Sequence, residues 1–355
     1  MKVVIAGGGT GGHVFPAIAI AHELVARGVA PHFIGAERGM EARAVPAAGF
    51  GLTLLPLEPM KGGGLRRALR GGMIAATGVA AAMRELRRLR PAVVLGVGGY
   101  AAGPTCLAAR LLGIPMAVLE PNAAAGFTNR VLAPLAKRAY LAWPEVGARF
   151  RSVRVCGVPV RSRFVASPYR AGRRIVVLGG SQGAKALNTT LPTVFGALRR
   201  RKYEISVLHQ TGQSSVEETR ARYHAEGLLD ATVTPFVDDV PAAFAEASLI
   251  VARAGASTVA EILASARPSV LVPFPFAADD HQRANAREVE RVGAGVCVEE
   301  ADLGARLPAL LEELLGPNED ARSPRLRAMA EAAAAHARPR AAADIAEDLL
   351  KLARV

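Results

Sequence analysis

The sequence predicts an α/β protein built from two doubly wound halves, each with a parallel sheet. Short apolar segments alternate with helical segments, and the order starts again near residue 173 with another strand and glycine-rich turn. A chain of 355 residues, 51% of them hydrophobic, is long enough for about two separate cores. We therefore expect two Rossmann-like domains with helices on both faces of each sheet.

In the first half, apolar runs of strand length are separated by segments of helical periodicity. The predicted strands are KVVIAG (2–7), PHFIGA (31–36), LTLLPL (52–57), AVVLGVG (92–98) and PMAVLE (115–120). The predicted helices are 15–27, 39–47, a segment within 65–89, and 103–112. Regular alternation of strand and helix is typical of a parallel sheet.

The second half repeats this design. RRIVVLGGSQGAKALN (173–188) combines an apolar strand, a glycine-rich turn and a helix, as KVVIAGGGTGGHVFPAI (2–18) does. Further strands are predicted at EISVLHQ (204–210), ATVTPF (231–236), LIVARA (249–254) and SVLVPF (269–274). We expect domains at 1–160 and 161–340, and a C-terminal helix at 341–355 that packs back on the first domain.

Composition excludes several classes of protein. The longest apolar stretches, such as LLGIPMAVL (111–119), fall short of the roughly 20 residues that span a bilayer, so an integral membrane protein is not expected. MKVVIAGGG (1–9) is typical of a strand entering a turn, not of a signal peptide. Three widely spaced cysteines, Cys106, Cys156 and Cys297, suit a reducing compartment, and the expected location is the cytosol.

The net charge of +13 lies almost entirely in the first half. Residues 1–160 carry 19 Lys and Arg against 7 Asp and Glu, whereas the remainder is nearly balanced. Aromatic residues make up only 5% of the chain and no zinc-finger spacing occurs, so nucleic acid is not the expected partner. An anionic membrane surface or a phosphorylated substrate fits the charge better.

The stretch GGGTGGHVFP (7–16) predicts an anion site, because its bare amides lie between a strand and the start of a helix. His13 follows the glycines and is a candidate general base, although it also suits a hydrogen bond that only closes the turn. Gly7, Gly9 and Gly12 match a dinucleotide-binding fingerprint, with Glu37 as its acidic partner. An oxidoreductase that uses NAD is therefore an open alternative.

Three segments of the second half predict contacts with an anion and with sugars. Ser181 lies in the glycine turn 179–183, and the segment 253–261 reads as a strand end, a tight turn and a helix start. We expect Glu261 in the first turn of that helix, where a carboxylate accepts sugar hydroxyls or only complements the dipole. Gln282 follows another strand, and its amide suits a second sugar or a solvated loop.

Further motifs are spread along the whole chain: GGTGGHVFPA (8–17), GGY (98–100), N-x3-G-x2-N (122–129), G-x-PVR (157–161), GGSQGA-x3-N (179–188), TPFVDD (234–239), RAGAST-x2-E (253–261) and DDHQ-x2-NA (279–286). Taken together, these motifs resemble those of the MurG family of inverting UDP-N-acetylglucosamine transferases. The chain departs from the usual family pattern at Pro121 and Val158. The resemblance implies the two-domain glycosyltransferase B fold and transfer of N-acetylglucosamine to the undecaprenyl-pyrophosphoryl muramyl-pentapeptide of peptidoglycan synthesis, a process that serves cell shape and division.

The resemblance also implies roles for individual residues. In the first domain, which would face the acceptor and the membrane, His13 is the base and the sugar and pyrophosphate contacts are Thr10, Gly11, Gly12 and Asn122. In the second domain, which would bind the UDP-sugar, the nucleotide contacts are Arg161, Ser181, Phe236, Val237, Ala256, Ser257, Thr258, Val259, Ala260 and Glu261. Gln282 would contact N-acetylglucosamine.

No Asp-x-Asp motif and no His/Cys cluster with metal-ligand spacing occurs in the sequence, so we expect neither a metal nor another cofactor to be obligatory. Helix amino termini and glycine-loop amides would stabilise the departing UDP in a single inverting displacement. A sugar-nucleotide-binding protein without catalysis is a second open alternative. Turnover of the acceptor would distinguish the enzyme from it.

A lipid-linked acceptor implies a peripheral protein on the cytoplasmic face of the plasma (inner) membrane. The predicted contact is MKGGGLRRALRGGMI (60–74), in which cations lie beside apolar residues. A solvated basic loop is the alternative interpretation. The residues concerned are Lys61, Arg66, Arg67, Arg70, Leu65, Leu69, Met73 and Ile74.

Overall fold

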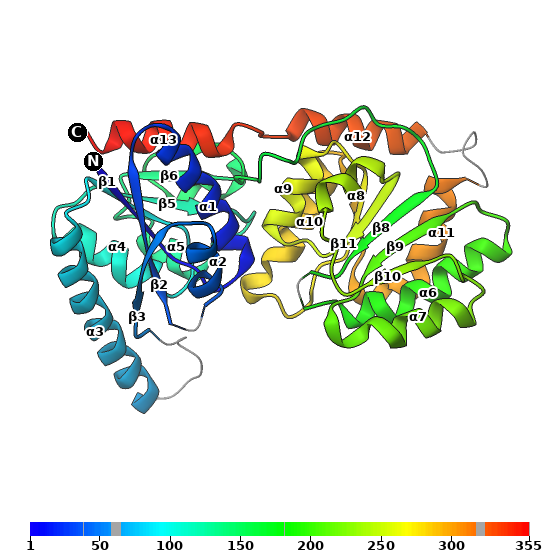
Figure 1. Ribbon diagram of the computed structural model, residues 1–355, viewed down its shortest axis with the longest axis horizontal. Coiled ribbons are helices and arrows are strands. Elements are labelled where there is room, and N and C mark those ends of the chain that lie inside the picture. Colours follow the sequence, from blue (N-terminus) through cyan, green and yellow to red (C-terminus); the bar gives the residue numbers. More distant parts are fainter. Residues whose placement is uncertain (38, 58–64, 181, 317–323, 355) are drawn as a thin grey trace. The chain divides into compact units, whose positions relative to one another are not determined.

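The computed structural model describes residues 1–37, 39–57, 65–180, 182–316 and 324–354, with the backbone alone for residues 65–76. The chain divides into two compact units (Figure 1). The first unit contains Met1–Arg161 and Arg338–Val355, and the second contains Ser162–Ala337. Each unit is described by itself below.

Within the described residues, the first unit has one parallel sheet of seven strands in the order β3-β2-β1-β4-β5-β6-β7. The strands are β1 (Lys2–Ala6), β2 (Ala30–Ala36), β3 (Gly51–Leu55), β4 (Val93–Gly96), β5 (Met116–Glu120), β6 (Arg138–Leu141) and β7 (Val153–Val155). Strand order reverses beside β1, because β2 and β3 extend to one side and β4 to β7 to the other. This reversal is the point at which doubly wound sheets bind ligands, at the carboxyl ends of the strands.

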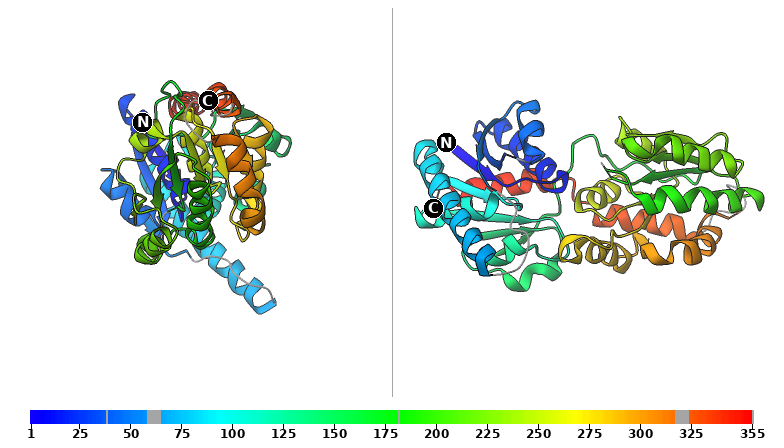
Figure 2. Two further views of the ribbon diagram at one scale, coloured as in Figure 1. Left: turned by 90° about the vertical axis from the view of Figure 1, so that its right-hand side faces the viewer. Right: turned by 90° about the horizontal axis from the view of Figure 1, so that it is seen from below.

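Helices connect these parallel strands. They are α1 (Gly11–Ala26), α2 (Glu41–Ala47), α3 (Leu65–Leu89), α4 (Ala102–Leu111) and α5 (Phe127–Leu132), with a 3-10 turn η1 (Pro144–Arg149) after β6. The helix that we expected at 15–27 begins earlier, at Gly11, so that His13 lies in its first turn. In Figure 2, α3 extends away from the rest of its unit.

The C-terminal helix α13 (Ala341–Leu352) completes the core of the first unit. It lies beside α1 (Figure 1), and its Ile345, Ala346 and Leu349 are fully buried in the cluster formed by β1, α1 and β4. Its Asp348 is also buried and forms ion pairs with Arg138 at 3.0 Å and Arg154 at 2.8 Å. The last residues of the chain therefore stabilise the sheet that begins with its first residues.

The second unit has a parallel sheet of six strands, again counted within the described residues, in the order β10-β9-β8-β11-β12-β13. The strands are β8 (Arg174–Leu178), β9 (Ser206–Gln210), β10 (Thr232–Thr234), β11 (Leu249–Ala252), β12 (Ser269–Leu271) and β13 (Gly295–Cys297). The helical segments are α6 (Lys185–Arg200), η2 (Gln213–Ser215), α7 (Val216–Ala225), α8 (Val240–Glu246), α9 (Ala256–Ala264), η3 (Ala278–Asp280), α10 (His281–Arg291), η4 (Glu300–Asp302), α11 (Leu303–Leu315) and α12 (Pro324–His336).

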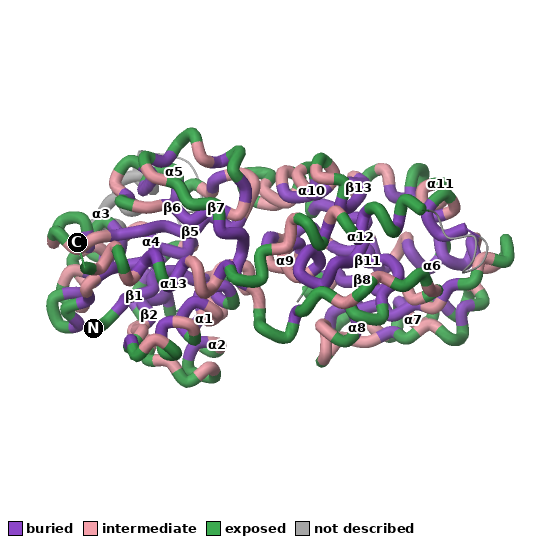
Figure 3. The backbone as a smooth tube through the Cα atoms, turned by 90° about the horizontal axis from the view of Figure 1, so that it is seen from above, coloured by how far each residue is buried: buried purple, intermediate pink, exposed green. Residues whose placement is uncertain are grey.

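The predicted fold class, two parallel sheets flanked by helices, is confirmed. Central strands such as β5 and β11 are buried along their whole length (Figure 3), as expected for a sheet covered on both faces. The structure adds three strands that we did not predict, β6, β7 and β13. No helix in the described part of the chain is both long enough and apolar enough to span a membrane.

Candidate functional site

The predicted site residues of the first unit lie in loops at the carboxyl edge of its sheet. β1, β4 and β5 are neighbours, so the loops that follow them emerge side by side. These loops contain Thr10 after β1, Gly98 after β4 and Asn122 after β5.

Two of these loops interlock through their glycines. The amide of Gly8 donates to the carbonyl of Gly98 over 3.2 Å. A Cβ atom on Gly7 would lie 2.2 Å from the carbonyl oxygen of Gly98, and one on Gly99 would lie 2.2 Å from that of Gly8. Glycine is therefore required at positions 7 and 99 because the loops after β1 and β4 pack directly against each other, and not primarily because a ligand approaches.

A buried carboxylate, Glu41, occupies the anion position of the first glycine loop. Glu41 is 1% exposed and accepts hydrogen bonds from the amides of Gly9 at 2.7 Å and Ala36 at 3.0 Å. Any side chain on Gly8, Gly35 or Gly39 would overlap it, since a Cβ there would lie 2.0–2.5 Å from its atoms. The expectation that these amides serve an external anion is thus wrong at Gly9, whose amide is already bound.

Sequence reasoning missed Glu41. In the sequence, Glu41 appears only as an acidic residue at the start of a helix. A carboxylate at this position is equally common on helices exposed to solvent, where it complements the helix dipole, so it did not point to a buried role. The same observation weakens the dinucleotide interpretation, because the fingerprint needs the Gly9 amide near a pyrophosphate.

His13 lies in the first turn of α1, close to the interlocked loops. The Cδ2 and Nε2 atoms of its ring come so close to Gly98 that a Cβ there would lie 2.8 Å from both. Its Nδ1 lies 3.3 Å from the hydroxyl oxygen of Thr10. Gly98 therefore provides the space for the ring, and Thr10 orients it.

The loop after β5 is organised by a second buried carboxylate, Glu120. Its Oε1 accepts from the backbone and side-chain amides of Asn122 at 3.0 and 3.1 Å, and its Oε2 accepts from Gly126 and Asn129 at 2.9 Å each. Burial raises the pKa of Glu120 above its ordinary value, and these N–H donors oppose that rise. Asn122 is thus held at the sheet edge through its own amide group.

In the second unit, α9 begins directly after β11 and presents the predicted anion site. Ala256, Ser257 and Thr258 form its first residues, whose amides have no acceptor one turn earlier in the helix. The buried Oγ of Ser257 has no hydrogen-bond partner among the described residues. Glu261 is the sixth residue of α9, so the prediction that it lies in the first turn is wrong. A role in complementing the helix dipole is weakened as well, because that effect falls off beyond the first turn.

The loop after β10 carries the residues predicted to contact a base. Phe236 is 47% exposed, and its carbonyl accepts the hydroxyl of Thr234 over 2.7 Å. β10 lies three positions from β11 in the sheet, which separates this loop from α9 by roughly 14 Å at about 4.8 Å per strand. Val237 follows in the same loop. This spacing suits an extended nucleoside diphosphate with its base at one loop and its phosphates at the other.

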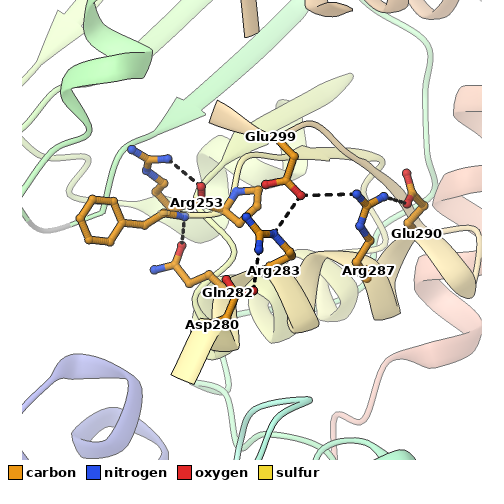
Figure 4. Close-up of polar contacts among 9 residues, drawn as sticks. Arg253, Asp280, Gln282, Arg283, Arg287, Glu290 and Glu299 are labelled. Atoms are coloured by element: carbon orange, nitrogen blue, oxygen red, sulfur yellow. Dashed lines mark hydrogen bonds and ion pairs between the residues drawn. The ribbon is translucent and has the colours of Figure 1, made fainter. Parts of the chain in front are cut away.

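Gln282 lies on α10 and is fixed by its carbonyl oxygen, which accepts from the amide of Phe274 over 3.0 Å (Figure 4). Contacts of Gln282 with a sugar would therefore be made through its Nε2 donor. Arg253 pairs with Glu300, and its guanidinium carbon lies 5.4 Å from the centre of the Phe274 ring. Asp280, just before α10, has a φ of 53°, a left-handed conformation that aspartate tolerates better than most residues.

The structure brings the predicted residues into two sets, one in each unit. Thr10, Gly11, Gly12, His13 and Asn122 share the carboxyl edge of the first sheet, and Phe236, Val237, Ala256 to Glu261 and Gln282 follow strands of the second. Arg161 is exposed and is the last residue of the first unit before the chain enters the second. Ser181 and residues 60–64 of the predicted membrane contact lie outside the described residues.

Comparisons with known proteins give one consistent result. The model of the glycosyltransferase family 28 N-terminal domain matches residues 3–141, and that of the family 28 C-terminal domain matches residues 174–345. A relative in Sorangium cellulosum, UDP-N-acetylglucosamine--N-acetylmuramyl-(pentapeptide) pyrophosphoryl-undecaprenol N-acetylglucosamine transferase, is 47% identical over 100% of this chain and 89% of its own length. A protein of the same name in Anaeromyxobacter dehalogenans is 43% identical, covering 100% of this chain and 94% of its own length.

Solved structures agree with these relatives. The crystal structure of Acinetobacter baumannii MurG is 34% identical, covers 99% of both chains and superposes with a TM-score of 0.82. The calicheamicin glycosyltransferase, at 18% identity, a TM-score of 0.65 and 99% coverage of this chain and 98% of its own, shares the fold alone. The predicted glycosyltransferase B fold is confirmed, and the chain belongs to the MurG family of glycosyltransferases.

Proposed function

We propose that the protein transfers N-acetylglucosamine from UDP-N-acetylglucosamine to the lipid-linked muramyl-pentapeptide, converting lipid I to lipid II in peptidoglycan synthesis. The observation that carries this proposal is the 47% identity, along the entire chain, to a relative that bears this activity in its name. Nothing observed favours an oxidoreductase, and the amide of Gly9 that a dinucleotide needs is bound by Glu41.

His13 is the proposed base. With a proton on Nδ1 donated to the Thr10 hydroxyl, Nε2 becomes the basic nitrogen of the ring. That nitrogen removes the proton from the acceptor hydroxyl as the hydroxyl oxygen attacks the anomeric carbon, while UDP leaves from the opposite face. The displacement inverts the anomeric configuration and forms no sugar-enzyme intermediate.

The donor contacts are proposed for the second unit. Amides at the start of α9 and the unpartnered hydroxyl of Ser257 bind the departing phosphates, which develop charge as the bond breaks. Phe236 covers the uracil, and the Val237 backbone contacts the edge of that base. Glu261 accepts the ribose hydroxyls, and Gln282 donates from Nε2 to the sugar.

The donor assignment is tested by Glu261→Ala. Loss of hydrogen bonds to a charged carboxylate should weaken UDP-N-acetylglucosamine binding by about 1.5–3 kcal/mol, measured by calorimetric titration. Glu299→Ala, a substitution in the ion-pair cluster of Figure 4, serves as the matched control in the same unit. A folded Glu261→Ala protein with wild-type affinity would remove Glu261 from the site.

The first unit is the proposed membrane-facing part of the molecule. Its cationic excess suits anionic headgroups, and α4, which packs against α3, exposes Leu107 and Leu111 beside Arg110. The cytoplasmic face of the inner membrane follows from the nature of the proposed acceptor.

A triple substitution in α3 tests the membrane contact. At about 1 kcal/mol per surface cation, neutralising Arg66, Arg67 and Arg70 should strongly reduce sedimentation with anionic vesicles, most of all at low salt. Donor affinity should be retained. Unchanged sedimentation would mean that this stretch is not the membrane contact and that the positive charge of the first half has another cause.

The reaction itself is tested with labelled UDP-N-acetylglucosamine and a lipid-linked muramyl-pentapeptide. We expect a labelled disaccharide-lipid whose new glycosidic bond has the inverted configuration, read by NMR. Donor binding without any transfer would favour the non-catalytic alternative, and a product with retained configuration would overturn the single-displacement mechanism.

A further inference from the structure

A pocket of about 380 Å³ opens at the carboxyl ends of β5 and β6 in the first unit. Its volume falls within the range of small-molecule sites. The pocket shares its loop with Asn122 but contains none of the residues assigned above. Its lining includes Ala123, Ala124, Ala125, Arg130, Glu145 and Arg149.

The three alanines that line the pocket lie in a loop that is anchored at both ends. Glu120 binds the amide of Asn122 on one side of the three alanines and the amide of Gly126 on the other, so both ends of the loop are anchored on one buried carboxylate. Methyl side chains keep the pocket open, because any longer side chain at these positions would occupy part of its volume. A rigid loop with small side chains is preorganised to receive a ligand.

The charge of the lining favours an anionic ligand. Arg130 comes from α5 and Arg149 from the last turn of η1, while Glu145 is the one acidic residue among the lining residues. Guanidinium groups bind carboxylates through paired hydrogen bonds, which gives both charge and geometry. Alanine side chains beside them suit the apolar parts of a peptide.

We propose that this pocket binds the peptide stem of the acceptor, with Arg149 contacting its terminal carboxylate. The inference rests on the proposed function. A muramyl-pentapeptide carries its peptide on the same sugar as the reacting hydroxyl, and a pentapeptide linked through its amino end terminates in a free carboxylate.

The distances along the sheet fit this ligand. His13 follows β1 and the pocket follows β5 and β6, at most three strand positions away, or roughly 14 Å at about 4.8 Å per strand. Five extended residues span up to about 17 Å. A sugar held near His13 and Asn122 can therefore extend its peptide along the sheet edge into the pocket.

The test compares two soluble short-chain lipid acceptors, one with the full pentapeptide and one whose lactyl group ends in a simple amide. The quantity measured is the ratio of kcat/KM for the first to kcat/KM for the second, which cancels effects on the donor and on the base. Arg149→Ala should lower this ratio about tenfold, and Arg149→Lys should restore much of it because the cation is retained. Arg151→Ala removes the same charge two residues away, on an exposed side chain outside the pocket, and should leave the ratio unchanged.

Each outcome is decisive. A ratio for Arg149→Ala within twofold of the wild type, or an equal loss in Arg151→Ala, overturns the peptide subsite. A wild-type protein that uses both acceptors equally well also overturns it while leaving the proposed function intact. A wild-type protein that transfers sugar to neither acceptor refutes the proposed function and, with it, this inference.

Discussion

Replacing Glu41 with glutamine should loosen the first glycine loop. Glu41 binds two backbone amides at 2.7 and 3.0 Å and is 1% exposed. Glutamine keeps the shape and one acceptor oxygen, but its NH2 group faces the second amide, so one bond to a charged group is lost and a buried N–H is left unpaired. Such losses cost about 2–4 kcal/mol together.

This cost should be visible at single amides. A reduction of about 2–4 kcal/mol in the free energy of local opening corresponds to hydrogen exchange roughly 30- to 700-fold faster at Gly9 and Ala36. Turnover should fall while donor affinity is retained, because His13 follows this loop and a displacement of about 1 Å can cost about 100-fold.

The matched control is Glu23→Gln in α1 of the same unit. Glu23 pairs with Arg27 at the surface, with its side chain 36% exposed, so its loss should cost at most about 1 kcal/mol. Exchange at Gly9 within threefold of the wild type in Glu41→Gln, or equal acceleration in the control, would refute the view that Glu41 holds the loop.

Gly98→Ala should reduce turnover by about 100-fold while donor affinity is retained. The new Cβ would lie 2.8 Å from the His13 ring and displace the ring, and the φ of 92° at this position is strained for alanine. Turnover is measured by steady-state kinetics and donor affinity by calorimetry, and a wild-type kcat would contradict the prediction. Burial of His209 lowers its pKa to about 3. Between pH 6.5 and 3 this histidine is therefore protonated in the unfolded state and neutral in the folded state. The free energy of unfolding should fall as the pH drops through this range, by up to about 1.4 kcal/mol per pH unit. Unfolding measured across this range should show a shallower pH dependence in His209→Leu, and identical slopes would exclude His209 as the cause.

Local patterns predicted the architecture because they are set by neighbouring residues. Buried parallel strands read as continuous apolar runs, and this identified KVVIAG as β1 and LIVARA as β11. The strand β13 (Gly295–Cys297) was missed because glycines at positions 293 and 295 interrupt its apolar run. The start of α1 was placed too late because Gly11 and Gly12 have low helix propensity, and the helix begins there despite them.

The site was predicted less completely because long-range contacts decide it. The glycines after β1 were attributed to ligand approach, but they accommodate a loop some 90 residues away and a carboxylate 32 residues away. Neither contact leaves a trace in local periodicity. Helix boundaries are similarly uncertain from sequence, which is why Glu261 was expected one turn too early.

The central claim is that this chain is a glycosyltransferase whose base is His13. The most direct measurement is single-turnover transfer of labelled N-acetylglucosamine to the lipid-linked muramyl-pentapeptide by wild type and His13→Ala, with UDP-N-acetylglucosamine affinity measured on the same samples. We predict that His13→Ala binds the donor as the wild type does and transfers sugar about 100-fold more slowly or worse, the usual scale for a positioned general base. Transfer by His13→Ala at the wild-type rate would contradict the claim.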